Sequence, residues 1–130
     1  MAVLIQYANG APGIRFDIDK KVFRIGRSLD NDLCIPDAFV SKAHAVIERR
    51  PSDRLDGSYE YVIRDLGSTN KTFVNDGQVE QARLCNEDVV RIGRNTFRFL
   101  VEPEDEKAVP RDLLESGTRS FSRRLRFGLG

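Results

Sequence analysis

The feature that most constrains the fold is a series of short apolar runs, separated by turn residues, that fills the first hundred residues. Residues 3–7 place apolar side chains at every second position before an Asn9-Gly10 turn. Residues 14–18 also carry apolar side chains at every second position. This alternation is typical of strands with one buried face. No stripe of helical period runs longer than two turns, which argues against a parallel sheet with crossover helices. The pattern therefore predicts an all-β protein.

Further strands are expected wherever apolar runs end at Gly, Pro, Asn or Asp. We expect residues 14–18 to form a hairpin with residues 22–25 around an Asp19-Lys20 tip, and residues 50–58 to form an exposed loop. The pattern gives about ten or eleven strands in a β-sandwich. The clearest runs are 3–7, 14–18, 22–25, 33–35, 45–48, 59–64, 72–74, 89–92 and 96–101.

Composition excludes several classes of function. The chain has 130 residues, of which 40% are hydrophobic and 32% charged, as in a soluble globular domain that can bury a core. A net charge of only +1 argues against a protein devoted to nucleic acid. No apolar run approaches the roughly 18 residues of a membrane span, and there is no signal-peptide pattern. We therefore expect a cytoplasmic protein without membrane contact.

Cysteine and histidine usage predicts neither a metal nor a cofactor. Cys34 and Cys85 lie in separate apolar contexts and are expected to be small buried side chains, not a disulfide. With one histidine and no Cys-x-x-Cys pair, the sequence offers no ligand set for structural zinc.

A boundary is expected after Val101. Residues 102–107 form an acidic linker, and the last twenty residues carry five arginines. We assign residues 1–101 to the folded domain and residues 102–130 to the linker and tail, with one or two helical turns expected at 111–115. We do not expect nucleic-acid binding by this tail, because Phe121 and Phe127 are its only aromatic side chains for base stacking.

Three segments are rich in hydrogen-bonding groups, and each is expected at the end of a strand. They are Gly26-Arg27-Ser28, Ser41-Lys42-Ala43-His44, and the run from Asp65 to Asn75, which reads Asp-Leu-Gly-Ser-Thr-Asn-Lys-Thr-Phe-Val-Asn. Loops held by a rigid sandwich are common places for binding residues. We call these segments the three motif loops.

The motif loops contain what a phosphorylated side chain requires. A phosphomonoester carries about −1.5 to −2 charges and three acceptor oxygens, so its site needs a guanidinium and several further donors. Arg27 suits the first role. Ser41 offers a hydroxyl, Lys42 a second cation, and Thr69 with Asn70 further donors.

In this order, the three motif loops resemble the forkhead-associated (FHA) family of phosphothreonine-binding modules. The resemblance covers roughly residues 1–101. It implies an eleven-stranded antiparallel β-sandwich of the FHA type with a short C-terminal tail. It also implies a non-catalytic phosphothreonine-binding module in Ser/Thr kinase signalling, whose partner is a phosphothreonine-containing protein, either a Ser/Thr kinase or its substrate.

The resemblance assigns roles residue by residue. The positions that contact the phosphate or the neighbouring peptide backbone in the family correspond here to Arg27, Ser41, Lys42, Thr69 and Asn70. The supporting positions, among which His44 is expected to brace the loop behind the site, are Gly26, Ser28, His44, Gly67 and Asn75.

Two positions depart from the family pattern. Lys71 stands where the family has glycine, so a positive φ there would cost about 1 kcal/mol of strain. The family usually has Asn-Gly where this chain has Asn75-Asp76-Gly77, so the glycine comes one position later, although the sequence still favours a turn. Lys71 lies in the third motif loop, which is expected to select the peptide, and the displaced glycine lies just beyond its end.

The sequence is also compatible with two other classes of function. An enzyme would use Ser41 as nucleophile and His44 as base, but no third orienting group and no catalytic motif accompany them. The stronger alternative is a phosphate-independent interaction or assembly module with the same fold. Such a protein would be expected to have lost Arg27, Ser41 or Asn70, and this chain has all three.

Overall fold

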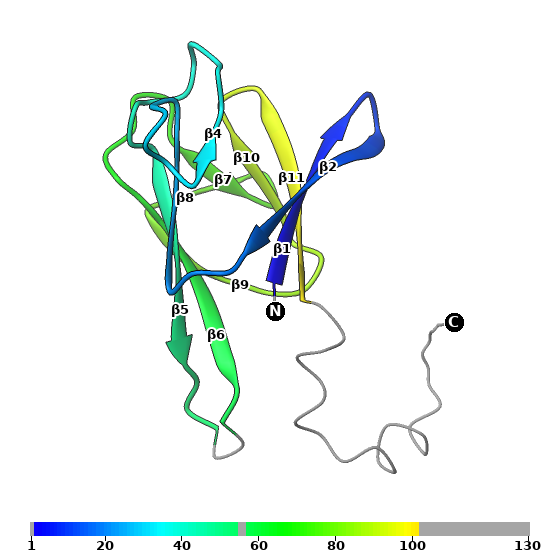
Figure 1. The fold of residues 1–130 in the computed structure, drawn as a ribbon, viewed down its shortest axis with the longest axis vertical. Helices are drawn as coiled ribbons and strands as arrows, with labels where there is room; N and C mark the ends of the chain where they lie inside the picture. Colours follow the sequence, from blue (N-terminus) through cyan, green and yellow to red (C-terminus); the bar gives the residue numbers. More distant parts are fainter. Residues whose placement is uncertain (1, 55–56, 102–130) are drawn as a thin grey trace.

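The computed structural model describes residues 2–54 and 57–101, so the linker, the tail and the turns expected at 111–115 lie outside the described residues. Every regular element in the described part is a β-strand (Figure 1). No helix there is long and apolar enough to cross a membrane. The strands are β1 (Ala2–Ala8), β2 (Ala11–Ile18), β3 (Val22–Gly26), β4 (Leu33–Cys34), β5 (Ala45–Pro51), β6 (Tyr59–Asp65), β7 (Thr72–Val74), β8 (Gly77–Val79), β9 (Gln81–Leu84), β10 (Val89–Ile92) and β11 (Asn95–Val101).

The strands form the predicted sandwich of two sheets. One sheet has six strands in the order β2-β1-β11-β10-β7-β8, and the other has five in the order β4-β3-β5-β6-β9. The ladders are antiparallel except that β3 and β4 pair in parallel through Ile25 and Leu33. The all-β sandwich expected from the alternating runs is therefore confirmed.

The core lies between the two sheets and is built from side chains that alternate inward on each strand. The ring of Phe99 on β11 meets the ring of Tyr61 on β6 edge-on, with centroids 5.5 Å apart, so this pair joins the sheets. The side chains that are at most 1% exposed in this cluster include Leu4, Ile18, Ile25, Ile47, Ile63, Val90, Ile92, Phe97 and Phe99.

The turn prediction was right at one place and wrong at another. Asn9 (φ 55°) and Gly10 (φ 77°) form the two-residue turn between β1 and β2. The expected hairpin around Asp19-Lys20 does not exist, because β2 pairs with β1 whereas β3 pairs with β4 and β5. The chain crosses between sheets there. Alternation marks which side chains face a core, but it does not say which sheet supplies the strand.

The expectation of two buried cysteines was also wrong. Cys34 is half-buried, Cys85 is exposed, and both are free thiols. Each follows a buried leucine, Leu33 and Leu84 respectively, at the end of a short strand. Since neighbouring side chains on a strand point to opposite faces, a buried leucine turns the next side chain outward.

Replacing Phe97 by alanine tests the assigned core. The fully buried ring leaves a cavity when it is removed, so Phe97→Ala should lower the free energy of unfolding by about 3 to 5 kcal/mol in denaturant titrations. Ile14, which is 61% exposed, provides the control, and Ile14→Ala should change stability by no more than about 0.5 kcal/mol. Equal losses in the two variants would contradict the assignment.

Candidate functional site

Neighbouring strands bring the three motif loops to one end of the five-stranded sheet. The register pairs Ile25 of β3 with Ala45 of β5, and Ala45 with Asp65 of β6. The first motif loop follows Ile25, the second ends just before Ala45, and the third begins at Asp65. Because these strands alternate in direction, all three loops lie at the end of the sheet away from Pro51 of β5 and Tyr59 of β6 (Figure 1).

Main-chain hydrogen bonds join the first motif loop to the second. The Arg27 N–H donates to the Ser41 carbonyl over 2.9 Å, and the Ser28 N–H donates to the Lys42 carbonyl over 3.3 Å. A Cβ atom at Gly26 would overlap the Lys42 carbonyl oxygen. The close approach of the two loops therefore requires glycine at position 26.

His44 joins the second motif loop to the third. Its side chain is fully buried. The Nδ1 atom accepts the Ser41 N–H over 3.0 Å, which places the ring hydrogen on Nε2, and Nε2 donates to the Lys71 carbonyl over 2.9 Å. The main chain of His44 also donates to Ile25 and accepts from Leu66. His44 thus connects the second motif loop to the third and bonds the strand residue that directly precedes the first.

Asp65 shapes the start of the third motif loop. Its Oδ2 accepts the N–H groups of Gly67 and Ser68 over 3.0 and 2.9 Å, and its Oδ1 accepts the hydroxyls of Ser68 and Thr72. Burial acts to raise the pKa of Asp65, but these hydrogen bonds outweigh it and hold the pKa below its usual value. Gly67 has φ 76°, a left-handed conformation that favours glycine.

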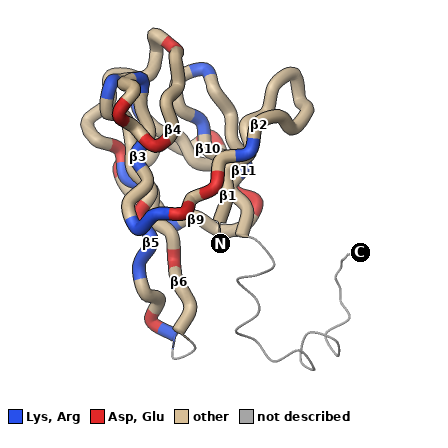
Figure 2. Tube along the Cα trace, viewed as in Figure 1, with Lys and Arg blue, Asp and Glu red and all other residues tan. Residues whose placement is uncertain are grey.

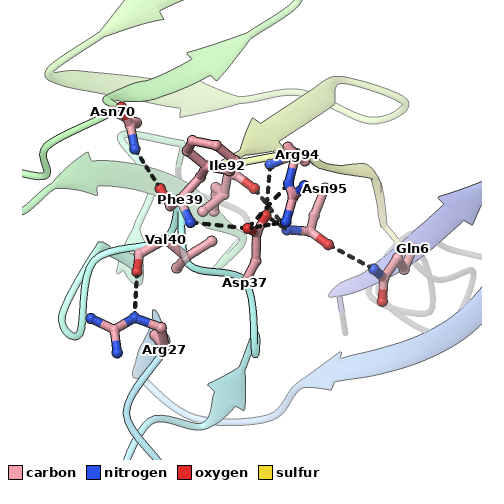
Figure 3. Close-up of polar contacts among 9 residues, drawn as sticks. All are labelled: Gln6, Arg27, Asp37, Phe39, Val40, Asn70, Ile92, Arg94 and Asn95. Atoms are coloured by element: carbon pink, nitrogen blue, oxygen red, sulfur yellow. Dashed lines mark hydrogen bonds and ion pairs between the residues drawn. The ribbon is translucent and has the colours of Figure 1, made fainter.

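Two of the side chains expected to bind phosphopeptide are anchored to the segment that precedes Ser41. Arg27 Nε donates to the Val40 carbonyl over 3.0 Å, and Asn70 Nδ2 donates to the Phe39 carbonyl over 2.9 Å (Figure 3). Arg27 is exposed, and its terminal guanidinium nitrogens have no partner among the described residues. They are available to a ligand.

The remaining candidates are also accessible. Ser41 is half-buried, and its Oγ accepts the Thr69 N–H over 3.1 Å, which leaves its own hydrogen to donate. Lys42 and Lys71 are exposed and pair with no acidic side chain in the described ranges. Figure 2 shows basic and acidic positions mixed over the fold, with basic positions present on the loops at this end. Each motif loop contributes one cation here.

The structure does not bring every candidate into this cluster. Asn75 instead bonds to the start of β10, where its Oδ1 accepts the Val89 N–H over 2.9 Å and its Nδ2 donates to the preceding Asp88 over 3.0 Å. Asn75 and Asp76 have φ of 51° and 70° and form the turn between β7 and β8. Lys71 has φ 70°, so it adopts the strained conformation at the position where the family pattern has glycine.

Asp37 was not identified from the sequence. The side chain is 8% exposed. Its oxygens accept the Phe39 N–H over 2.9 Å, the Arg94 N–H and guanidinium, and the Asn95 amide over 3.0 Å (Figure 3). The Phe39 and Arg94 groups hold its pKa well below the usual range. Its partners Arg94 and Asn95 lie 57 and 58 residues away, beyond any local signal.

Ser41 and His44 are not arranged as a nucleophile and its base. The Ser41 main-chain N–H, not its hydroxyl, contacts His44 Nδ1, while Nε2 is bonded to the Lys71 carbonyl. The Ser41 hydroxyl meets the Thr69 N–H instead. A base must bond the hydroxyl proton that it removes, so this geometry does not activate Ser41.

A groove is present elsewhere on the surface. It has a volume of about 660 Å³ and includes Gln6, Tyr7, Arg94 and Arg98 among its lining residues, but none from the motif loops. The candidate site is instead an open surface of loop ends. Such a surface suits an extended peptide better than an enclosed small molecule.

Replacing His44 tests its bracing role. His44→Ala leaves the Ser41 N–H and the Lys71 carbonyl without their partner, so the free energy of unfolding should fall by about 1 to 3 kcal/mol in denaturant titrations. The exposed Lys42 gives the control, because Lys42→Ala should leave stability nearly unchanged. A His44 variant as stable as the wild type yet unable to bind ligand would instead make His44 a direct contact.

Comparison with known proteins identifies relatives of this arrangement. A sequence model of the FHA domain matches residues 23–93. The glycogen accumulation regulator GarA of Mycolicibacterium smegmatis is 35% identical over 105 residues, which are 81% of this chain and 62% of GarA. The chain therefore spans less than two thirds of the length of this relative.

Solved structures agree with the sequence match. An FHA domain structure, from an analysis of phosphothreonine-dependent FHA domain interactions, aligns with a TM-score of 0.65 at 27% identity, over 78% of this chain and 97% of that one. Mycobacterium tuberculosis EmbR, in complex with a low affinity phosphopeptide, aligns with a TM-score of 0.65 at 31% identity, over 78% of this chain and 24% of EmbR. This chain belongs to the FHA domain family.

Proposed function

We propose that this chain is a non-catalytic module that binds a phosphothreonine-containing segment of a partner protein in Ser/Thr kinase signalling. The observation that carries the proposal is that the Arg27 terminal nitrogens, which have no partner among the described residues, and the Ser41 hydroxyl lie on two loops joined by main-chain hydrogen bonds. The residues assigned to the ligand are Arg27, Ser41, Lys42, Thr69 and Asn70.

The charges and donors of these residues match a phosphate. The two terminal nitrogens of Arg27 can bond two phosphate oxygens at once, and the Ser41 hydroxyl and the Lys42 ammonium can bond the third. Charge-assisted hydrogen bonds contribute about 1.5 to 3 kcal/mol each. Together with main-chain contacts, a few of them reach the roughly 8 kcal/mol of micromolar affinity.

Asn70 is suited to hold the partner's main chain. One of its amide hydrogens is used on the Phe39 carbonyl, which fixes the orientation of the side chain. The amide oxygen and the second hydrogen remain for a peptide N–H and carbonyl. Thr69 stands beside it on the same loop and is exposed.

The relatives support the same function. The FHA domain compared above takes part in phosphothreonine-dependent interactions, and EmbR was captured with a phosphopeptide. GarA is a regulator. By this proposal the partner is a Ser/Thr kinase or its substrate, met in the cytoplasm. A phosphate-independent module with the same fold is the alternative, but it would not need the hydrogen-bond donors of Arg27 and Ser41 that have no partner among the described residues.

Phosphate dependence is the first test of this function. A phosphothreonine peptide selected from an oriented library should bind with roughly micromolar affinity in calorimetry, and its unphosphorylated counterpart should not bind detectably. Arg27→Ala should abolish binding, because it removes the bidentate donor. Arg83→Ala is the control, since Arg83 is exposed on β9 beside Glu60 and should leave affinity unchanged. Equal affinity for the two peptides would refute phosphate recognition.

Preference for phosphothreonine over phosphoserine is the second test. The resemblance to the family implies a small apolar notch for the threonine γ-methyl group. One methyl in a fitted pocket is worth about 1 to 3 kcal/mol, so competition binding should rank the phosphothreonine peptide above an otherwise identical phosphoserine peptide by that amount. If both peptides compete equally well, the notch is absent from this chain.

A further inference from the structure

The two anchored side chains of the candidate site depend on one short segment. Arg27 Nε bonds the Val40 carbonyl, and Asn70 Nδ2 bonds the Phe39 carbonyl, so adjacent carbonyls orient both side chains (Figure 3). We call residues 37–40 the clamp segment. If these carbonyls turned away, both side chains would lose the contact that fixes their direction.

Asp37 forms hydrogen bonds both within the clamp segment and to residues outside it. Within the segment, its Oδ1 accepts the Phe39 N–H over 2.9 Å and its carbonyl accepts the Val40 N–H over 2.9 Å. Outside it, the carboxylate accepts the main-chain N–H and guanidinium of Arg94, each over 3.0 Å, and the Asn95 amide. The segment is thereby attached to the turn between β10 and β11.

The β10–β11 turn is shaped for this attachment. Gly93 has φ 61°, and a Cβ atom there would lie 2.6 Å from Val40 Cγ2 and 2.9 Å from Asp37 Oδ2. Only a residue without a side chain lets the turn approach the clamp segment this closely. Asp37 on the clamp segment and Gly93 on the turn are therefore both needed for this contact. The contact joins the six-stranded sheet to the loops of the candidate site.

On the basis of the proposed function, we propose that Asp37 is a positioning residue for phosphopeptide binding. By fixing the clamp segment against Arg94 and Asn95, it presents the carbonyls that orient Arg27 and Asn70 before the ligand arrives. It does not touch the phosphate. Because the two side chains are already ordered, binding does not have to lower their conformational entropy, which would otherwise weaken the affinity.

Substitution by asparagine separates this role from simple packing. Asp37→Asn keeps the shape but replaces one acceptor oxygen by an amide that donates. In either orientation, that amide would face N–H groups, those of Phe39 and the Arg94 guanidinium or those of the Arg94 main chain and Asn95. Glu48→Gln is the matched control, because Glu48 also accepts from two arginines, Arg50 and Arg64, but lies on β5 away from the clamp segment.

The experiment measures the free domain and the bound domain separately. In the free domain, NMR would follow the Arg27 Nε–H, which reports the clamp segment, and the His44 Nε2–H, which reports the rest of the loop structure. In Asp37→Asn, the Arg27 signal should lose its protection from exchange while the His44 signal persists. Affinity for the phosphothreonine peptide should fall by about tenfold to a hundredfold, and Glu48→Gln should match the wild type.

Other results would overturn the proposal. An Asp37→Asn domain that keeps the protected Arg27 signal or the wild-type affinity shows that Asp37 only stabilises the fold. If both NMR signals are lost, the milder Arg94→Gln decides, since it leaves the Phe39 and Asn95 bonds to Asp37 in place. Selective loss of the Arg27 signal in that variant supports the proposal, whereas an unchanged signal, or loss of both, contradicts it.

The proposed function can fail independently. If the wild-type domain binds no phosphothreonine peptide, the function is wrong. The Arg27 Nε–H signal of the free variants still shows whether Asp37 positions Arg27.

Discussion

The arrangement of the site depends on a single buried imidazole. His44 bonds the Ser41 N–H on one side and the Lys71 carbonyl on the other, and its main chain bonds Ile25 and Leu66. Because the ring has no exposed surface, it cannot exchange these partners for water. The second and third motif loops must therefore lie side by side in the folded protein. The placement of the Ser41 main chain relative to that of Lys71 follows from this constraint.

Buried and exposed polar groups have different roles in the candidate site. Asp37, Asp65 and His44 are shielded from solvent to different degrees, and each uses its side-chain oxygens or nitrogens on protein partners. The outermost groups of Arg27 and Lys42 remain free among the described residues. Internal groups with hydrogen-bond partners give a rigid frame, and by our proposal the outer groups without partners bind the phosphate.

Much of the fold could be predicted from the sequence because its signals are local. The alternating runs identified the sandwich, and Asn9-Gly10 identified a turn. Strands β8 and β9 were not singled out, since β8 has three mostly exposed residues and the alternation of β9 covers only four residues. The predicted hairpin at Asp19-Lys20 and the predicted burial of Cys34 and Cys85 were wrong. Which sheet a strand joins, and which way the side chain at its end points, depend on residues far away in the sequence.

The sequence by itself determined the chemistry of the site, because the donors and cations of Arg27, Ser41, Lys42 and Asn70 can be read from three short motifs. Only the tertiary structure decided where those groups stand. The row Ile25–Ala45–Asp65 brings the motifs to one end, and Asp37 finds partners 57 residues later in the chain. Pairing across a sheet is set by packing of the whole core, which no short stretch of residues encodes.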